Sequence, residues 1–392
     1  MSSTRTDRIN RKQKHINMLQ SGSIPQNRLA SLDILRGLDL FMLVFFQPVF
    51  VAFARHWADL PVFSFFLDQF GHADWTGFKA WDLVMPLFLF MVGTAMPFSF
   101  EKYLNNPDKT VIYKKIAKRF MILFILGIVV QGNLLSLDPM AIRIYTNTLQ
   151  AIAVGYVMAA MMLLHLSKRG QIIVTALLLV GYWALLTFLG DFTPEGNFAE
   201  EVDRTLLGRV RDGVFYSDDG AWHFSDNYRY TWLLTSMVFG VTTMFGVFAG
   251  QIMKYGTDKR KNSQWLLTIG IALLLAGWLL SFQTPIIKKI WSASMTLWSG
   301  GWCFLLMALF YYVIDYKGQS KGANWLKIYG MNSIIAYTLG MVINFRSTAG
   351  SLLWGLEKYT GDYYAAIITF ANFGILFFVL YLMYKLKIFI KI

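Results

Sequence analysis

The sequence has little cysteine and little charge for its length. Only Cys303 occurs among 392 residues, which excludes an intrachain disulfide and a cysteine-based metal site. Charged residues make up 15% of the chain and hydrophobic residues 56%, whereas soluble domains contain about 25% charged residues. Apolar runs of membrane-spanning length recur from residue 34 onwards, too long for the strands of a membrane β-barrel. The composition therefore excludes a soluble enzyme and a disordered protein and predicts an all-α, polytopic transmembrane helical bundle.

Apolar stretches of about 20 residues, the length that crosses a bilayer, predict ten spans. They lie at 34–54, 80–100, 119–137, 147–166, 171–189, 231–253, 264–282, 290–314, 325–344 and 364–384. Lysine and arginine concentrate in every second connection, so the positive-inside rule predicts that both termini are cytoplasmic. The same rule accounts for the net charge of +13 without a nucleic-acid partner. The polar residues before the first span carry no apolar signal-peptide core, so we expect no removable signal peptide.

Two domains follow from this arrangement, a basic cytoplasmic tail at 1–30 and a transmembrane domain at 31–392. The spans leave two large segments on the outer, periplasmic side, at 55–79 and 190–230. The second combines acidic with aromatic residues, which suits a polar, ring-shaped ligand such as a sugar and equally suits an ordinary exposed loop with interfacial aromatics. We find no internal repeat, so an inverted-repeat transporter has no positive support.

Several polar side chains lie where a membrane span should be apolar. Such groups mark function or bond neighbouring helices together, and for the amides both interpretations remain open. Asp33 and Arg36 are three residues apart and share a helical face. The others are Asp39, Gln47, Asp82, Gln150 and Asn332.

His72 is the strongest candidate for chemistry, because it precedes the second span and has Asp82 ten residues downstream. An imidazole can accept a proton near neutral pH and can carry an acyl group transiently. No Ser-His-Asp elbow, glycine-rich phosphate loop or HExxH motif is present. The lone histidine and scattered carboxylates also lack metal-ligand spacing, so we expect no metal.

Ordered short motifs resemble those of the heparan-α-glucosaminide N-acetyltransferase family of transmembrane acyltransferases. The run from Arg28 to Gly37 resembles the first-span signature of that family. The run from His72 to Gly77, followed by Asp82-Leu-Val-Met-Pro86, resembles its H-x-x-W-x-G and DL-V-x-P block. Further matches, in the same order, are Arg143-Ile144, Leu149-Gln150, Val202-Asp203-Arg204, Gly246 to Gly250, Lys288 with Trp291-Ser292, Gly330 to Ile334, and Lys387 to Ile392.

The resemblance implies transfer of an acetyl group from cytoplasmic acetyl-CoA to the amino group of a terminal glucosamine on the far side of the membrane. It implies that His72 is the catalytic residue, as a base or a transient acetyl carrier, and it suggests a homodimer. No segment resembles the luminal N-terminal domain of the animal lysosomal members, which favours a bacterial inner-membrane enzyme. Two departures are Gln47, where the family usually has Asn, and Ala151, where it tends to have Arg.

On this basis we predict three groups of site residues. The catalytic group is His72, with Asp82 orienting the imidazole and Gln47 or Lys288 donating to the developing oxyanion. Acetyl-CoA would contact Arg36, Asn332, Ser333, Lys288, Trp291 and Ser292, and the sugar Asp74, Trp75 and Arg143. Two alternatives remain, a sugar or glycolipid transporter or flippase without chemistry, and an O-acetyltransferase of an envelope glycan.

Overall fold

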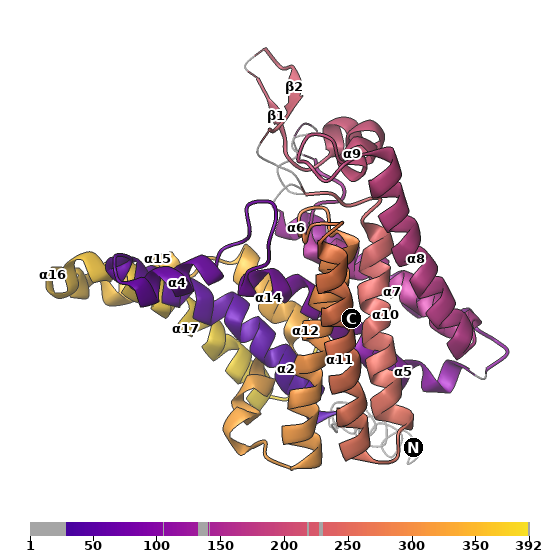
Figure 1. Ribbon diagram of the computed structural model, residues 1–392. Helices are drawn as coiled ribbons and strands as arrows, with labels where there is room; N and C mark the ends of the chain where they lie inside the picture. The colour runs from indigo at the N-terminus through magenta and orange to yellow at the C-terminus, as the bar shows by residue number, and fades with distance from the viewer. Residues whose placement is uncertain are drawn as a thin grey trace, which may run out of the picture.

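The computed structural model describes residues 29–104, 106–131, 140, 142–217, 219–226 and 230–390. The predicted tail at 1–30 therefore lies almost wholly outside the described residues, as does the end of the predicted third span. One bundle contains the long helices together with a few shorter ones, which stand side by side (Figure 1). They are α2 (Ala30–Phe41), α3 (Gln47–Ala54), α5 (Val84–Leu104), α6 (Thr110–Val130), α7 (Thr148–His165), α8 (Lys168–Leu189), α10 (Ser236–Tyr255), α11 (Lys259–Ser281), α12 (Ala293–Phe310), α14 (Ser333–Val342) and α17 (Tyr364–Lys385).

Eight helical segments of the described chain are long and apolar enough to cross a membrane, and they coincide with eight of the ten predicted spans. This confirms the prediction of a multi-pass membrane protein that is mostly helical, with a short β-hairpin. The described parts of the other two predicted spans also fall largely on helices. The first half of α6 carries four basic residues, and the span at 325–344 is divided at Asn332 into α13 (Lys327–Met331) and α14. The number of spans and the side of each terminus stay predictions.

Helices α5 and α10 cross in backbone contact because glycine lies at the crossing on both sides. A Cβ atom at Gly93 would lie 1.9 Å from the carbonyl oxygen of Thr243, and one at Gly246 would lie 1.9 Å from that of Phe90. Small residues allow this close approach between membrane helices. The contact holds α5 at the centre of the bundle.

Two helices deviate from regular α-helix. A π-helical segment, η1 (Met42–Phe46), joins α2 to α3, and a second, η5 (Tyr311–Tyr316), ends α12. To one side of the bundle project the shorter helices α4 (Pro61–Gln69), α15 (Arg346–Leu353) and α16 (Glu357–Thr360) (Figure 1).

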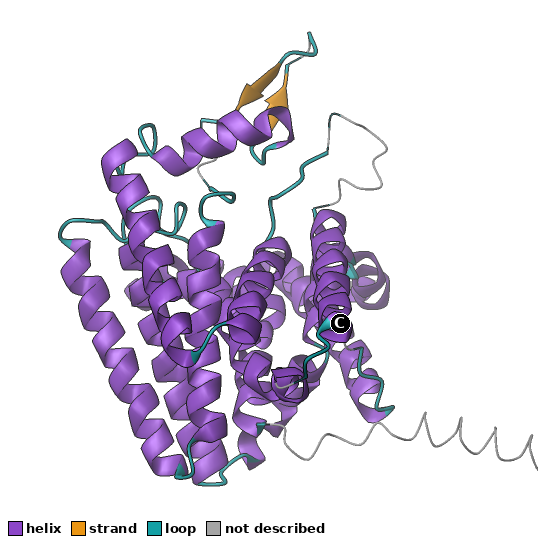
Figure 2. Cartoon of the chain, turned by 90° about the vertical axis from the view of Figure 1, so that its right-hand side faces the viewer, coloured by secondary structure: helices purple, strands orange, loops and turns teal. Residues whose placement is uncertain are grey.

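One end of the bundle is capped by α9 (Phe198–Leu207) and by a hairpin of β1 (Val214–Tyr216) and β2 (Trp222–Phe224), and we call it the hairpin end (Figure 2). The two strands are antiparallel, with Val214 opposite Phe224. The buried carboxylate of Asp203 on α9 accepts hydrogen bonds from the backbone N–H groups of Trp232 (2.7 Å) and Leu233 (3.0 Å), just before α10. These bonds tie α9 to the bundle.

Candidate functional site

The loop between α4 and α5 presents His72 at the hairpin end. Asp82 lies in the 3-10 turn Ala80–Leu83 that leads into α5, and its carboxylate is fully buried. One oxygen accepts from the backbone N–H of Lys79 (2.9 Å) and, at 3.4 Å, from that of Ala73. The other lies 2.8 Å from Nδ1 of His72. The start of a helix also favours a negative charge, so this carboxylate is well placed to hold the imidazole.

Lys288 reaches the same two side chains from the loop between α11 and α12. Its ammonium lies 2.9 Å from Nδ1 of His72, 3.4 Å from Nε2 and 3.2 Å from the carboxylate of Asp82. The side chain of Lys288 is 9% exposed and that of Asp82 is fully buried, whereas that of His72 is 42% exposed. The three groups therefore form a compact cluster in which only the imidazole is open to a reactant. We call it the histidine cluster.

Burial and charge act on Lys288 in opposite directions. Removal from water lowers its pKa to about 8, while the Asp82 carboxylate beside it acts to raise the pKa. Near neutral pH this lysine is therefore still mostly charged, yet close to its titration range. A cation in this position can stabilise a developing oxyanion next to the imidazole.

Three contacts fix the His72 loop to the rest of the hairpin end. Thr76 forms an isolated β-bridge with Ile287, the residue before Lys288. The backbone N–H of Gly77 donates to the carbonyl of Ile286 (2.8 Å). The indole N–H of Trp75 donates to the carbonyl of Phe192 (2.8 Å), in the segment after α8. The backbone bridge thus sets the distance between the histidine and the lysine.

A cavity of about 930 Å³ lies between α2, α5, α6, α7, α10 and α14. This volume is near the top of the range of roughly 300–1,000 Å³ that is typical of ligand pockets. Its lining on α5 runs from Phe88 to Glu101, which corresponds to about 20 Å along the helix axis. Phe88 is six residues after Asp82 on the same helical segment, which corresponds to about 9 Å. The cavity therefore leads from near the histidine cluster towards the opposite end of the bundle.

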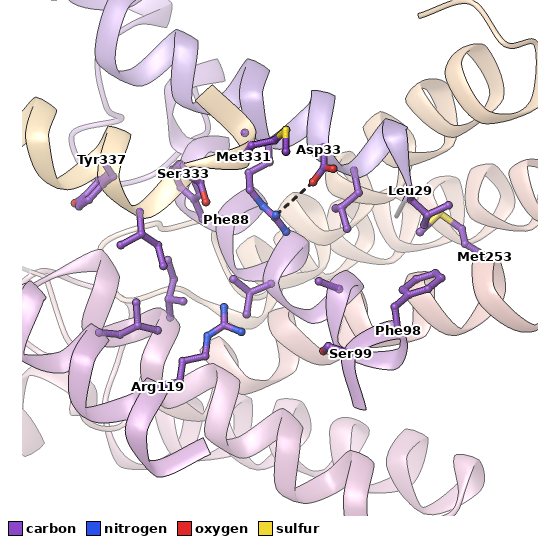
Figure 3. A pocket seen from close by; sticks show the side chains of 18 of the residues that line it. Leu29, Asp33, Phe88, Phe98, Ser99, Arg119, Met253, Met331, Ser333 and Tyr337 are labelled. Atoms are coloured by element: carbon purple, nitrogen blue, oxygen red, sulfur yellow. Dashed lines mark ion pairs between the residues drawn. The ribbon is translucent and has the colours of Figure 1, made fainter. Parts of the chain in front are cut away.

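Charged side chains of both signs line this cavity. The carboxylate of Asp33 lies 3.8 Å from the guanidinium of Arg36 (Figure 3). Arg36 also donates to the carbonyl of Met91 (3.5 Å). Arg119 stacks over the ring of Tyr156 at 4.4 Å, and its buried Nε has no hydrogen-bond partner within the described parts of the chain. Lys254 pairs with Glu101 at 3.1 Å. These cations lie on three different helices around one space.

Five of the six predicted acetyl-CoA residues fall into two separate groups. Arg36 and Ser333 line the cavity, as do their neighbours Asp33 and Met331. Lys288 instead joins the histidine cluster. Trp291 and Ser292 follow it in the same loop, where Ser292 Oγ donates to the carbonyl of Pro285 (2.7 Å) and accepts from the N–H of Ile287 (3.1 Å).

The remaining predicted residues have other surroundings. The amide of Asn332 bonds to the backbone at Ile388 and Ile390. Gln47 lies 3.5 Å from the carbonyl of Phe70, two residues before His72. Asp74 is exposed in the loop that carries His72. Arg143 donates to the carbonyl of Val214 (2.7 Å) and so supports the hairpin.

Sequence reasoning did not single out Lys254, Lys259 or Asp315 as residues of the cavity. They lie at the ends of apolar helices, where basic and acidic residues are ordinary features of membrane proteins. Lys254 donates to the carbonyl of Pro97 (2.7 Å), and Lys259 donates to the carbonyl of Asp315 (2.9 Å). These contacts come from the tertiary packing and leave no local signal in the sequence.

Comparison with known proteins supports the resemblance found in the sequence. Residues 28–194 match the family described as "Heparan-alpha-glucosaminide N-acetyltransferase, catalytic". The chain is 27% identical to heparan-alpha-glucosaminide N-acetyltransferase of Homo sapiens and 25% identical to that of Mus musculus. Each comparison covers 79% of this chain, and 52% and 53% of the relatives. The chain therefore spans about half the length of the curated relatives it matches. His72 and Asp82 lie within residues 28–194, the region that matches the family, whereas Lys288 lies beyond that region.

Proposed function

We propose that this chain, which is similar to the heparan-α-glucosaminide N-acetyltransferases, is a transmembrane acetyltransferase that uses acetyl-CoA to acetylate an amino sugar. The observation that supports this most directly is the histidine cluster, set about 9 Å along α5 from a cavity of about 930 Å³. The cavity provides room for a large donor, and the cluster provides a base beside a cation. Acetyl-CoA enters from the cytoplasmic side, and the sugar binds on the periplasmic side of a bacterial inner membrane.

In the proposed reaction, the amine nitrogen of the sugar attacks the carbonyl carbon of the thioester. Nε2 of His72 takes the proton of the amine, because Nδ1 faces Asp82 at 2.8 Å. Lys288 stabilises the oxyanion. As the C–S bond breaks, the proton passes to the sulfur, which leaves as the thiol of CoA. Alternatively, Nε2 itself attacks the thioester carbon, the C–S bond breaks and CoA leaves as a thiolate. The amine then attacks the acetyl carbon, the bond between that carbon and Nε2 breaks, and the proton of the amine passes to the freed Nε2.

The donor and acceptor have separate binding regions in this proposal. Arg36 and Arg119 bind the anionic part of acetyl-CoA, and Ser333 contacts the donor from α14. Asp74 and Trp75, in the loop of His72, contact the sugar, and Arg143 shapes this side through its bond to the hairpin. In this proposal the donor and the sugar reach the protein from opposite sides of the membrane. The acetyl group therefore crosses the membrane along α5.

Release of CoA from acetyl-CoA tests the proposal. The full chain, purified in detergent, is mixed with acetyl-CoA and glucosamine, and free thiol is followed for the unchanged protein, His72→Ala and the matched control His56→Ala. The ring of His56 contacts that of Tyr363, with centroids 4.4 Å apart, outside the histidine cluster. We expect a loss of about 10²–10⁴-fold for His72→Ala, the usual contribution of a general base, and no loss for His56→Ala.

The other outcomes separate the alternatives. Release that requires His72 but not glucosamine indicates an acetyl-enzyme and leaves the acceptor to be found among other amines or hydroxyl groups. Equal release from the unchanged protein and His72→Ala contradicts the catalytic assignment. If the protein neither releases CoA nor binds acetyl-CoA, the proposal that it is an acetyltransferase is contradicted. Sugar movement into liposomes without acetyl-CoA would then support a transporter.

A further inference from the structure

A short segment of chain after α17 lies against the break between α13 and α14. Nδ2 of Asn332 donates to the carbonyl of Ile388 (2.9 Å), and the backbone N–H of Ile390 donates to Oδ1 of Asn332 (3.1 Å). Both polar atoms of one buried amide therefore hold the backbone of residues 388–390, which we call the strap. Asn332 itself is 1% exposed, so this amide is not available to contact a donor molecule directly.

The strap forms part of the wall of the large cavity. Ile390 lines it together with Met331, Ser333 and Ile334, which flank Asn332 in the sequence. The break at Asn332 therefore supplies one part of the cavity wall and also the clamp that holds the neighbouring part. A change in the position of residues 388–390 would change the shape of this cavity.

The strap is held more weakly than the helices around it. Ile388 and Ile390 are 46% and 47% exposed, so their side chains contribute little packing. Lys387 adopts a left-handed conformation, with φ of 56°, where glycine is the usual residue. The N–H of Ile388 then bonds back to the carbonyl of Met383 (2.8 Å), which turns the chain sharply out of α17. Because a non-glycine residue in this conformation is strained, the turn depends on contacts such as the Asn332 clamp.

We propose that Asn332 is a positioning residue, which sets the affinity for acetyl-CoA by holding the strap as a movable wall of the donor cavity. This inference rests on the proposed function, because it assumes that the cavity binds acetyl-CoA. It replaces the direct donor contact predicted for Asn332 with an indirect role. The histidine cluster lies elsewhere, so the chemical step itself is not affected.

Three variants test the kinetic consequence. Asn332→Ala removes the clamp. Ile390→Pro removes the N–H that donates to Oδ1 of Asn332 and also changes a side chain of the cavity wall, on an exposed segment where the buried helices are untouched. Ile388→Ala is the matched control, because Asn332 bonds to its backbone and not to its side chain. For the first two we expect KM for acetyl-CoA to rise about tenfold, the effect of losing hydrogen bonds of ordinary strength. We expect kcat to stay within about twofold, and both constants to be unchanged in Ile388→Ala.

A labelling experiment measures the accessibility of the strap and does not depend on enzyme activity. The buried Cys303 is replaced in Cys303→Ser, and Ile390→Cys then supplies the only thiol of the chain. We expect saturating CoA to slow its reaction with a maleimide at least about fivefold, and Asn332→Ala to abolish this protection, because the released strap leaves the cavity wall. Equal protection with and without Asn332, or an unchanged KM, overturns the inference. Failure of CoA to bind even with Asn332 present overturns the proposed function, and the role of the strap with it.

Discussion

The ammonium of Lys288 lies 2.9 Å from Nδ1 of His72, although 216 residues separate them in the chain. The bridge between Thr76 and Ile287 sets this distance, since it joins the two loops beside both residues. Asp82 contacts both of them and is fully buried. An imidazole, a carboxylate and an ammonium are thereby held together by backbone contacts. Separate predictions follow for the ammonium and for the carboxylate.

Lys288 should give the reaction an alkaline limit. Its pKa is lowered to about 8 by burial, so it loses its charge as the pH rises through about 8. If the ammonium stabilises the oxyanion, kcat/KM should fall over that range. Lys288→Arg stays charged at higher pH and should move the fall upward, whereas Lys288→Met should lower kcat by about 10²–10³-fold. The pH profile of kcat/KM measures this, with Lys289→Met as the control. The same alkaline limit in all three variants would assign it to another group.

Asp82 should act on kcat through the orientation of His72. Asp82→Asn keeps the shape of the side chain but loses the charge that holds Nδ1–H of the imidazole. We expect kcat to fall by about 10²–10⁴-fold, with little change in KM for acetyl-CoA, because the cavity is lined by other residues. Steady-state kinetics at saturating donor measures the effect. Asp59→Asn, an exposed residue of the same connection, is the control, and a similar loss there would indicate general damage to the loop.

The helices of this fold were predictable because an apolar stretch of about 20 residues is a local signal. The described part of every predicted span falls largely on helix. The break at Asn332 was not predicted, because a single amide also occurs within intact membrane helices, where it bonds neighbouring helices together. Its amide is satisfied by the backbone of residues 388–390, which are distant in the sequence and lack any recognisable pairing motif. The break therefore became visible only once the chain was folded.

The candidate site was predictable only where its residues lie close together in the sequence. His72 and Asp82 are ten residues apart, and the contact expected between them is present at 2.8 Å. Their catalytic roles stay predictions. Lys288 and Arg36 both carry positive charge next to apolar runs, and nothing local distinguishes a lysine beside the histidine from an arginine inside the cavity. The two environments differ only in the folded structure. The bridge between Thr76 and Ile287 brings Lys288 to His72, whereas Arg36 lines the cavity.

Arg36 should matter for donor affinity. It lines the cavity and is held by Asp33 and by the carbonyl of Met91. Arg36→Met removes a charge that we assign to the anionic part of acetyl-CoA, so we expect KM for the donor to rise about 10–100-fold, as for loss of one charged hydrogen bond. Arg260→Met removes an exposed charge at the start of α11 and is the control. Isothermal titration with CoA measures the affinity of the two variants and of the unchanged protein. Equal affinities would remove Arg36 from the donor site.

Gly246 should be required for the packing of α10 on α5. A Cβ atom there would lie 1.9 Å from the carbonyl oxygen of Phe90, so the helices must separate in Gly246→Ala. We expect a loss of about 1–3 kcal/mol, as for other overpacked cores, and a lower Tm in detergent. Gly374→Ala on α17 is matched, because nothing lies within 4 Å of its Cβ position, and its Tm should be unchanged or slightly higher. Equal Tm values for the two variants would contradict the close crossing.

Asp203 should make the stability of the hairpin end depend on pH. Burial raises its pKa to about 6, although the N–H groups of Trp232 and Leu233 act to lower it. The folded state therefore keeps a proton that the unfolded state has lost between about pH 4 and 6, so stability is highest below that range and falls as the pH rises through it. The fall corresponds to about 3 kcal/mol. Asp203→Asn should remove this pH dependence, whereas Glu201→Gln, at an exposed neighbour on α9, should keep it. Tm measured from pH 4 to 7 tests this, and a slope that survives in Asp203→Asn would show that another group titrates.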